Sequence, residues 1–377
     1  MLDYETLRLI WWLLLGVLLI GFAIMDGFDL GSAFLLPIVA RTDIERRVVI
    51  NTVGPVWEGN QVWFILGGGA IFAAWPPLYA VSFSGFYIAM ILTLGALILR
   101  PVGFKFRSKL EHTRWRSAWD TALFIGGLVP SIVFGVAVGN LLLGVPFRFD
   151  SSMRASFEFG FFDLLSPFGL VCGLLSLSMI ATQGGSWLSV KTDGTVQARA
   201  RKAAMIAAAV AILLFAVGGL WVARLQGFVI TSVIDPSLPS DPLAKTVTRE
   251  AGAWLGNYGR YPWMAIAPIL GFAGIALALL MAWVRKPIAG FLASSIGILG
   301  IISTAGLSLF PFLMPSSSDP ASSLTVWDAS SSQLTLTVML IAAAIFLPII
   351  LAYTAWVYRV MRGKVSGEHV ENSDSAY

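Results

Sequence analysis

The feature that most constrains this chain is a succession of apolar runs, each about as long as a membrane-spanning helix. Such a helix needs about 20 apolar residues, and inside the bilayer it must satisfy all of its backbone hydrogen bonds internally. Nine runs meet this description: Leu9–Leu36, Gln61–Trp75, Leu78–Leu99, Thr121–Leu143, Phe162–Ala181, Ala203–Ala223, Trp263–Val284, Ile288–Phe312 and Leu334–Tyr358. The sequence therefore predicts an all-α polytopic membrane protein with nine transmembrane helices.

Composition supports the same class. Charged residues make up 12% of the chain, against about 25% in an average soluble domain, and the deficit is spread along the whole length. A soluble protein so poor in charge would expose apolar surface on every side. We expect a single transmembrane helical domain over residues 1–362, followed by a frayed, polar cytoplasmic tail over residues 363–377.

The basic residues predict the orientation. Eighteen of the 25 lysines and arginines follow odd-numbered helices, and the other seven lie in the N-terminus or follow even-numbered helices. Because basic loops stay in the cytoplasm, we expect a periplasmic N-terminus and a cytoplasmic C-terminus. Eight helices would mix basic loops onto both faces. The largest outer segment, residues 225–262, contains "LAKTVTREAGAW", where we predict a short helix.

Four charged residues fall within or beside the predicted helices. Asp26 and Asp29 are one turn apart in the inner half of the first helix, so they share a face. Glu58 begins the second helix in "VWEGNQVW", and Arg100 ends the third. Consecutive helices with short connections usually pack side by side. We therefore expect all four charges at a similar depth, near the cytoplasmic interface.

Two interpretations of these charges are open from residue chemistry. A charge at the bilayer centre costs about 2.5–3.5 kcal/mol on insertion scales, so a structural role requires pairing. We predict an ion pair between Arg100 and Asp29, with Asp26 as the alternative partner, while Glu58 caps its helix or faces water. In the functional interpretation, Glu58 carries protons or cations through an entrance that opens inward.

Ligands for haem or metal are scarce. The only histidines, His112 and His369, lie outside the predicted helices, and Cys172 is the only cysteine. Haem iron is held by His or Cys, with Met as one further ligand, and multi-cysteine metal sites need more than one cysteine. We expect this chain to ligate neither haem nor any metal ion.

Several stretches then resemble subunit II of the cytochrome bd-type quinol oxidases. They include "RLIWWLLLGVLLIGFAIMDGFDLG", the region around "VWEGNQVWFILGGGAIFAAWPP", "FPFLMPSS", "LTVWDASSSQLTL" and "LPIILAYTAWVYRVM". The resemblance covers essentially the whole chain. It implies two four-helix bundles plus one peripheral helix, in the bacterial cytoplasmic (inner) membrane.

The resemblance also implies a function. The complex oxidises quinol and reduces oxygen to water, taking up protons from the cytoplasm and so building a proton gradient. A partner, subunit I, carries two b-type haems, haem d and the quinol site. Subunit II is haem-free, holds no catalytic residue and stabilises its partner within the lipid bilayer; no nucleic acid is involved. The resemblance leaves open a structurally bound quinone in this chain and a small single-helix accessory subunit.

Residue roles are implied in the same way. The acid matching Glu58, which is Asp in many members, belongs to a cytoplasmic proton path, and Trp63 matches a residue at a lateral access route for oxygen. The proton path would comprise Glu58, Asp29, Asp26, Asn60 and Gln61. For Trp63, interhelical or interfacial packing is the alternative role, since tryptophan is common in both.

Two other functions remain in competition from the residues alone. An ion-coupled transporter would use the acids as its coupling site, and an architectural scaffold would use them only for pairing. Transporters usually bind near the bilayer midplane on broken helices. Here the acids lie towards one face, which favours the oxidase subunit.

Overall fold

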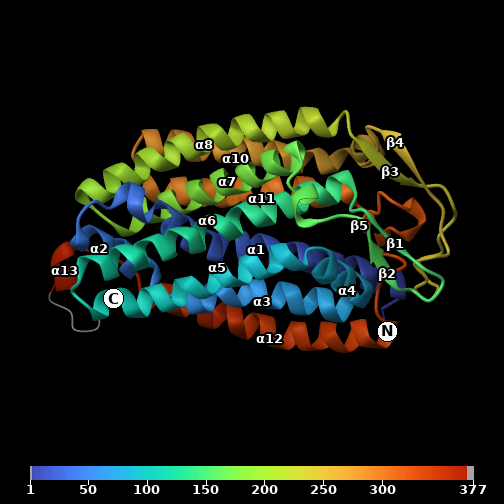
Figure 1. The fold of residues 1–377 in the computed structure, drawn as a ribbon, viewed down its shortest axis with the longest axis horizontal. Coiled ribbons are helices and arrows are strands. Elements are labelled where there is room, and N and C mark those ends of the chain that lie inside the picture. The colour runs from blue at the N-terminus through green and yellow to red at the C-terminus, as the bar shows by residue number, and fades with distance from the viewer. Residues whose placement is uncertain (1, 372–377) are drawn as a thin grey trace.

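The computed structural model describes residues 2–371 and consists mainly of helices laid along one long axis (Figure 1). Within this range, eight helices are long and apolar enough to cross a membrane. They are α1 (Tyr4–Val39), α5 (Tyr87–Phe106), α6 (Thr113–Leu143), α7 (Pro167–Lys191), α8 (Gly194–Val222), α10 (Ile266–Trp283), α11 (Pro287–Leu309) and α12 (Gln333–Val360). The chain is therefore a multi-pass membrane protein.

Several helices extend beyond their predicted apolar runs. Helix α6 begins at Thr113 rather than Thr121, α8 begins at Gly194 rather than Ala203, and α7 continues to Lys191. Hydropathy marks only the part of a helix that suits hydrocarbon. The extra turns are polar or basic, and a helix can carry such residues where it leaves the bilayer.

The segment between α1 and α6 departs most from the prediction. It forms α2 (Asp43–Val53), α3 (Trp57–Ala74) and α4 (Pro76–Gly85) before α5. Helix α3 is not among the eight apolar helices, because polar side chains occupy its first turns. The break at "WPP" is confirmed between α3 and α4, but the single predicted helix Leu78–Leu99 is divided at Phe86 into α4 and α5.

Six short strands lie at the end of the molecule opposite α2 (Figure 1), which an all-α prediction did not include. They pair antiparallel as β1 (Phe147–Phe149) with β2 (Ala155–Phe157), β3 (Gln226–Ile230) with β4 (Val247–Ala251), and β5 (Phe312–Met314) with β6 (Leu324–Thr325). The short helix predicted in "LAKTVTREAGAW" is wrong over Val247–Ala251. That segment begins with β-branched Val247 and Thr248, which favour a strand.

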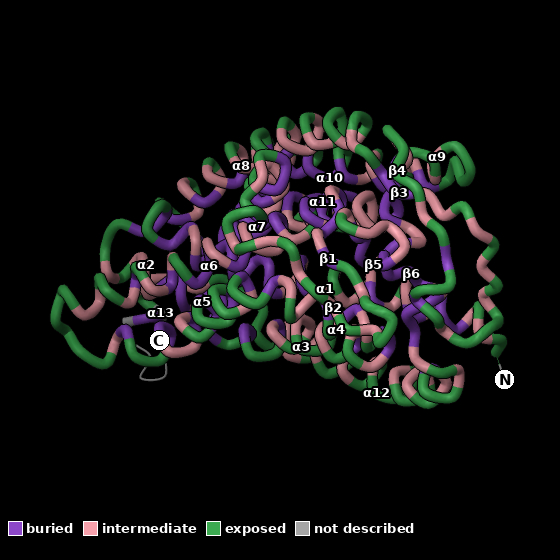
Figure 2. The backbone as a smooth tube through the Cα atoms, turned by 45° about the vertical axis from the view of Figure 1, so that its right-hand side comes forward, coloured by how far each residue is buried: buried purple, intermediate pink, exposed green. Residues whose placement is uncertain are grey.

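The contacts divide the long helices into groups. Helices α7, α8, α10 and α11 pack on one another, and α1 packs against α3, α6 and α7 while α5 packs against α6. Helix α12 touches α1 and α3. Only 6% of the residues in its most apolar stretch are buried, against 61% in the corresponding stretch of α7. In Figure 2 the buried backbone runs through the middle of the molecule, while α8 and α12 show exposed outer faces.

Glycines allow α1, α6 and α7 to approach closely. A Cβ added at Gly31 of α1 would lie 2.3 Å from the carbonyl oxygen of Ile180 on α7, and one added at Gly135 of α6 would lie 2.3 Å from the carbonyl oxygen of Cys172. Small residues at such crossings let helix backbones touch. The contact at Gly31 lies in the half of α1 that carries Asp26 and Asp29, and the contact at Gly135 joins α6 to α7.

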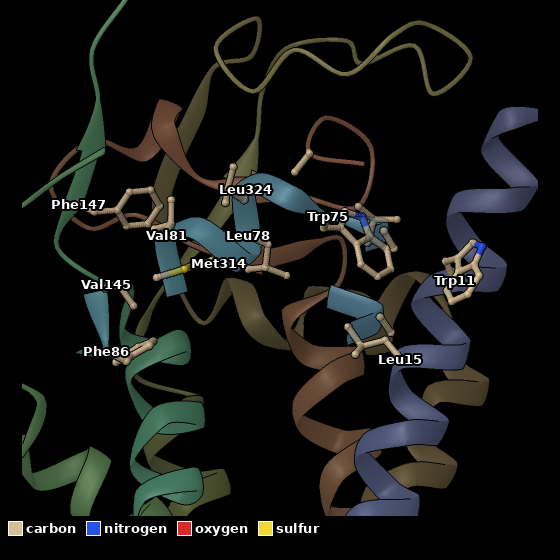
Figure 3. Close-up of a cluster of buried hydrophobic side chains, with 14 of the residues drawn as sticks. Trp11, Leu15, Trp75, Leu78, Val81, Phe86, Val145, Phe147, Met314 and Leu324 are labelled. Atoms are coloured by element: carbon tan, nitrogen blue, oxygen red, sulfur yellow. The ribbon is translucent and has the colours of Figure 1, made fainter. Parts of the chain in front are cut away.

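Apolar side chains close the end of the bundle that carries the strands (Figure 3). Trp11 and Leu15 of α1 lie near Trp75 and Leu78, and Met314 of β5 packs into the same cluster. The backbone N–H of Ser331 donates to the carbonyl oxygen of Ala74 at 2.8 Å. The end of α3 is thereby held at this end of the molecule.

The described part of the segment after residue 362 packs against the rest of the molecule, whereas we expected a frayed tail. The backbone N–H of Val365 donates to the carbonyl oxygen of Lys191 at 2.8 Å, α13 (Gly367–Glu371) packs on α2, and Val370 is fully buried. Apolar Val365 and Val370 supply this contact within an otherwise polar sequence. Residues 372–377 of the predicted tail lie outside the described residues.

Candidate functional site

A buried ion pair joins α1 to α5. Both carboxylate oxygens of Asp26 accept hydrogen bonds from Arg100, from Nη1 at 2.8 Å and from Nη2 at 3.0 Å, and both residues are fully buried. Gly126 of α6 makes room for this arginine, since a Cβ added there would lie 2.9 Å from Arg100 Cγ. A two-point Arg–carboxylate pair is strong and fixed in direction, which suits a structural role.

A second buried network begins one turn further along α1. Oδ2 of Asp29 accepts a hydrogen bond from Nδ2 of Asn60 at 2.8 Å, and Oδ1 of Asn60 accepts one from the hydroxyl of Tyr358 at 2.6 Å. Asp29 is fully buried, and its Oδ1 has no hydrogen-bond partner among the residues that the structure describes. The network therefore links α1, α3 and α12 through polar groups and leaves one carboxylate oxygen free.

Arg100 thus pairs with Asp26, the alternative partner in the prediction, and the pairing with Asp29 is wrong. Asp29 follows Asp26 by three residues, which is a rotation of about 300° around the helix axis, so the two side chains point about 60° apart. That rotation directs Asp26 towards α5 and Asp29 towards α3. The four expected charges therefore do not form one cluster, because the acids of α1 belong to two separate networks.

Glu58 lies apart from both networks. Its side chain is 70% exposed, and its ion-pair partner is Lys105, at 3.6 Å between Oε1 and Nζ. Asn60, two residues later, is only 1% exposed. Two residues along a helix are a rotation of about 200°, so the side chains point about 160° apart. Asn60 therefore faces α1 while Glu58 faces away from it. Gln61 is partly exposed and makes no hydrogen bond to a described residue.

Trp63 packs flat against α1. A Cβ added at Gly21 would lie 2.4 Å from its Cε3 atom, and the ring joins the apolar cluster around Phe22. The side chain is partly exposed, while its neighbours Val62 and Ile65 point outward. The structure therefore gives Trp63 a packing contact and also an outer edge that faces away from the bundle.

The sequence analysis missed two polar groups beside Asp29. Tyr358 is about 300 residues away in the chain, and nothing in the sequence pointed to it. Ser32 lies one turn beyond Asp29 on α1 and borders a cavity of about 10 Å³. Its buried hydroxyl has no hydrogen-bond partner in the described part of the chain. A cavity of this size is near the limit for one water molecule.

A charged network at the α2 end of the molecule was also missed. Arg107 is 1% exposed; its Nε donates to Asp120 at 2.5 Å and its Nη2 to Asp43 at 3.0 Å. Arg46 and Arg116 bind the same two carboxylates. Hydropathy assigns such residues to loops, yet here they connect α2 to the ends of α5 and α6.

Glu45 connects α2 to α8 and forms the capping box of α2 with Thr42. Its carboxylate accepts hydrogen bonds from the backbone N–H of Arg41, the hydroxyl of Thr195 and the guanidinium of Arg199, at 2.6, 2.9 and 2.9 Å. Burial by itself would raise the pKa of Glu45, but these hydrogen bonds outweigh it and lower the pKa to about 2.

Metal ligands do not gather among the side chains that the structure describes. No group of three or more His, Cys, Asp or Glu in that part of the chain is placed to hold a metal ion. His112 is exposed before the first turn of α6. His369 lies in α13, and its side chain is outside the described part.

Comparison with known proteins gives consistent matches over the full length. A family model described as cytochrome bd terminal oxidase subunit II matches residues 7–361. Subunit 2 of the cytochrome bd-I ubiquinol oxidase of Escherichia coli is 52% identical over all of both chains, and a probable cytochrome oxidase subunit 2 of Haemophilus influenzae is 49% identical over all of both. A chain in the structure of bd oxidase from Geobacillus thermodenitrificans is similar in fold, with a TM-score of 0.71 at 17% identity, covering 94% of this chain and 98% of that one.

Proposed function

The chain belongs to the cytochrome bd terminal oxidase subunit II family, and on that premise we propose that it supports a haem-bearing partner and delivers cytoplasmic protons to it. It is a subunit of a quinol oxidase and therefore works with a second subunit. By the family resemblance, that partner holds two b haems and haem d. The transporter alternative has no support, since full-length relatives are named as oxidase subunits.

The free carboxylate oxygen of Asp29 carries the proposal. Asp26 is neutralised by a two-point pair with Arg100, whereas the only hydrogen-bond partner of Asp29 among the described residues is a neutral amide. An ionisable group inside a membrane protein is usually functional, and this one is not used by the structural pair. Oδ1 of Asp29 is the atom that would take up and release a proton, while Asn60 and Tyr358 fix the other oxygen.

The route to Asp29 needs intermediate groups. Asp29 lies ten residues before the end of α1, about 15 Å along the helix axis. Ser32 and its small cavity lie on this stretch, and Glu58 lies two residues from Asn60 on the outer side of α3. We assign Glu58, on the exposed surface of α3, to proton uptake from the cytoplasm, with Gln61 beside it, and Asp29 to the buried position.

The path of α3 supports nine membrane crossings. Its first turns contact the inner half of α1 through Asn60, and its last residue, Ala74, is bonded to Ser331 at the opposite end. Helix α3 therefore runs the length of the bundle and would be the ninth span. We propose two four-helix bundles, α1–α3–α5–α6 and α7–α8–α10–α11, with α12 peripheral, a periplasmic N-terminus and a cytoplasmic C-terminus in the bacterial inner membrane.

The partner subunit would cover the face formed by α3 and α12. Helix α12 is almost unburied, and its outward residues include Ile341, Ile345 and Ile349. Glu58 is exposed on the adjoining helix, where a partner could accept its proton. Trp63 on the same helix would border an oxygen route; its contact with Gly21 supports packing, and its exposed neighbours support access from the lipid.

The test uses the purified complex carrying Asp29→Asn or Glu58→Gln. Each substitution keeps the side-chain shape but prevents proton exchange, so we expect wild-type haem content, reduced quinol oxidation and little change in the apparent KM for quinol. Glu58→Asp should retain most activity because the acid is kept. Glu111→Gln is the matched control, since Glu111 is an exposed acid outside both networks.

Two outcomes would contradict the proposal. Wild-type turnover and full proton uptake in both Asp29→Asn and Glu58→Gln would leave the chain as an architectural scaffold. A loss of haem together with activity in Asp29→Asn would instead indicate a structural role for that acid.

A further inference from the structure

A second polar site lies well away from Asp29, in an open cavity of about 380 Å³ between the ends of four helices. It lies where α7 and α10 end and α8 and α11 begin, in the upper half of the view in Figure 1. Its volume is within the range of small-molecule sites. The polar residues that line it are Ser186, Ser189, Gln197, Arg201, Arg285 and Lys286.

The cavity is strongly electropositive. Arg201, Arg285 and Lys286 all line it, and none of the three forms an ion pair with a described residue. No carboxylate is among the lining residues. Helix α11 begins at the cavity with Pro287, and the N-terminal end of a helix carries partial positive charge. Because α8 also begins at the cavity while α7 and α10 end there with partial negative charge, the attraction for an anion comes mainly from the three basic side chains.

Ser186 shows that the cavity is prepared for a polar ligand. The residue is 5% exposed and lines the cavity, yet its hydroxyl makes no hydrogen bond to a described residue. The neighbouring groups differ, because the Ser189 hydroxyl donates to Gly185 and the Gln197 amide donates to Ser189. The Ser186 hydroxyl is therefore available to bond a polar ligand in the cavity.

Arg285 occupies a backbone position that disfavours arginine. Its φ is 60°, in the left-handed region where glycine and asparagine are the easier residues. The turn between α10 and α11 would form more readily with either of those. Arg285 is one of the cations that line the cavity, which is a reason for an arginine at this position.

We propose that the cavity binds the phosphate headgroup of an anionic phospholipid. Basic pockets between membrane helices at their interfacial ends suit such headgroups, and the lining residues lie in the last turns of α7 and α10, the turn that joins α10 to α11, and the first turns of α8 and α11. Apolar residues next to the cavity are exposed on α8 and α10, including Ile206 and Leu280, and Trp283 is 70% exposed at its rim. Acyl chains could lie along these residues while the phosphate meets the cations.

The test measures thermal unfolding of the purified complex in phosphatidylcholine bilayers with increasing phosphatidylglycerol, and separately with inorganic phosphate. Phosphatidylglycerol should stabilise the wild type by binding the native state. Each cation near a membrane surface contributes about 1 kcal/mol, or about fivefold in affinity. Arg285→Asn and Arg201→Gln should therefore each weaken the apparent affinity about fivefold. Asparagine suits the turn, so Arg285→Asn should fold normally in phosphatidylcholine alone.

Lys202→Gln is the matched control, because Lys202 is exposed on α8 beside Arg201 but does not line the cavity. Its affinity for phosphatidylglycerol should stay close to wild type. An equal loss in Lys202→Gln and Arg285→Asn would show general surface attraction and overturn the site. Equal stabilisation by inorganic phosphate would assign the cavity to a soluble anion and overturn the lipid.

Discussion

The pair between Asp26 and Arg100 gives the sharpest test of the structure. Both oxygens of Asp26 are bonded to the guanidinium, and both side chains are completely buried. Removing one member of a buried pair typically costs about 3–5 kcal/mol, because the other charge is left without a partner. Arg100→Leu should therefore sharply reduce the amount of assembled complex in the membrane and lower its unfolding temperature.

The double variant separates pairing from a general defect. Replacing both members of a buried pair by apolar residues is often close to neutral. Adding Asp26→Leu to Arg100→Leu should thus recover most of the assembled complex. Adding Asp29→Leu instead should recover little, since Asn60 rather than Arg100 is bonded to Asp29. Complex yield and unfolding temperature are measured for each single and double variant.

Comparison of the single and double variants also shows which results would contradict the pairing of Asp26 with Arg100. If the defects of Asp26→Leu and Arg100→Leu simply add, the two residues do not interact energetically. If Asp29→Leu rescues Arg100→Leu as well as Asp26→Leu does, the arginine serves both acids and the division into two networks is wrong.

Three further predictions follow from single contacts. Tyr358→Phe removes the hydroxyl that donates a hydrogen bond to Asn60. We expect a loss of about 0.5–1.5 kcal/mol in the free energy of unfolding, unchanged haem content and slower quinol oxidation. Unaltered quinol turnover would argue against a role of Tyr358 in proton transfer. Gly21→Val should displace the Trp63 ring, because the added Cβ would collide with it. We expect a lower unfolding temperature and a raised apparent KM for oxygen. An unchanged KM would mean that Trp63 serves only in helix packing. The pKa of Glu45 is lowered from 4.5 to about 2 in the folded state, so its stabilisation is present above pH 4.5 and is lost as the pH falls towards 2. The difference in unfolding temperature between wild type and Glu45→Gln should narrow over that range, and a constant difference would contradict the assigned hydrogen bonds.

The large-scale fold could be predicted because it depends on summed hydropathy. Each of the eight long apolar helices overlaps a predicted run, although α5 begins only midway through the run Leu78–Leu99. The break at "WPP" follows from proline, which lacks a backbone N–H donor. The ends were less predictable, since polar turns continue a helix without adding hydropathy. The docked segment at Val370 and the strand pair at Val247 depend on contacts with distant residues, which no local pattern encodes.

The site was predictable in its members but not in their pairing. Helix periodicity places Asp26 and Asp29 on one broad face, but their partners depend on a rotation of about 60° and on how α3 and α5 pack against α1. Tyr358 completes the Asp29 network from the far end of the sequence. Such a partner can be found only when the packing of α12 on α3 is known.

The segment "VWEGNQVW" shows how one motif can serve two surfaces. In sequence, Glu58 and Asn60 look like a single polar cluster, but helical rotation directs them to opposite sides of α3. Asn60 binds Asp29 inside the bundle, while Glu58 and Lys105 remain at the surface. A proton taken up at Glu58 therefore cannot reach Asp29 directly through Asn60, whose amide already donates to one group and accepts from another. On the proposed path, transfer between them therefore needs a water molecule or a side chain of the partner subunit.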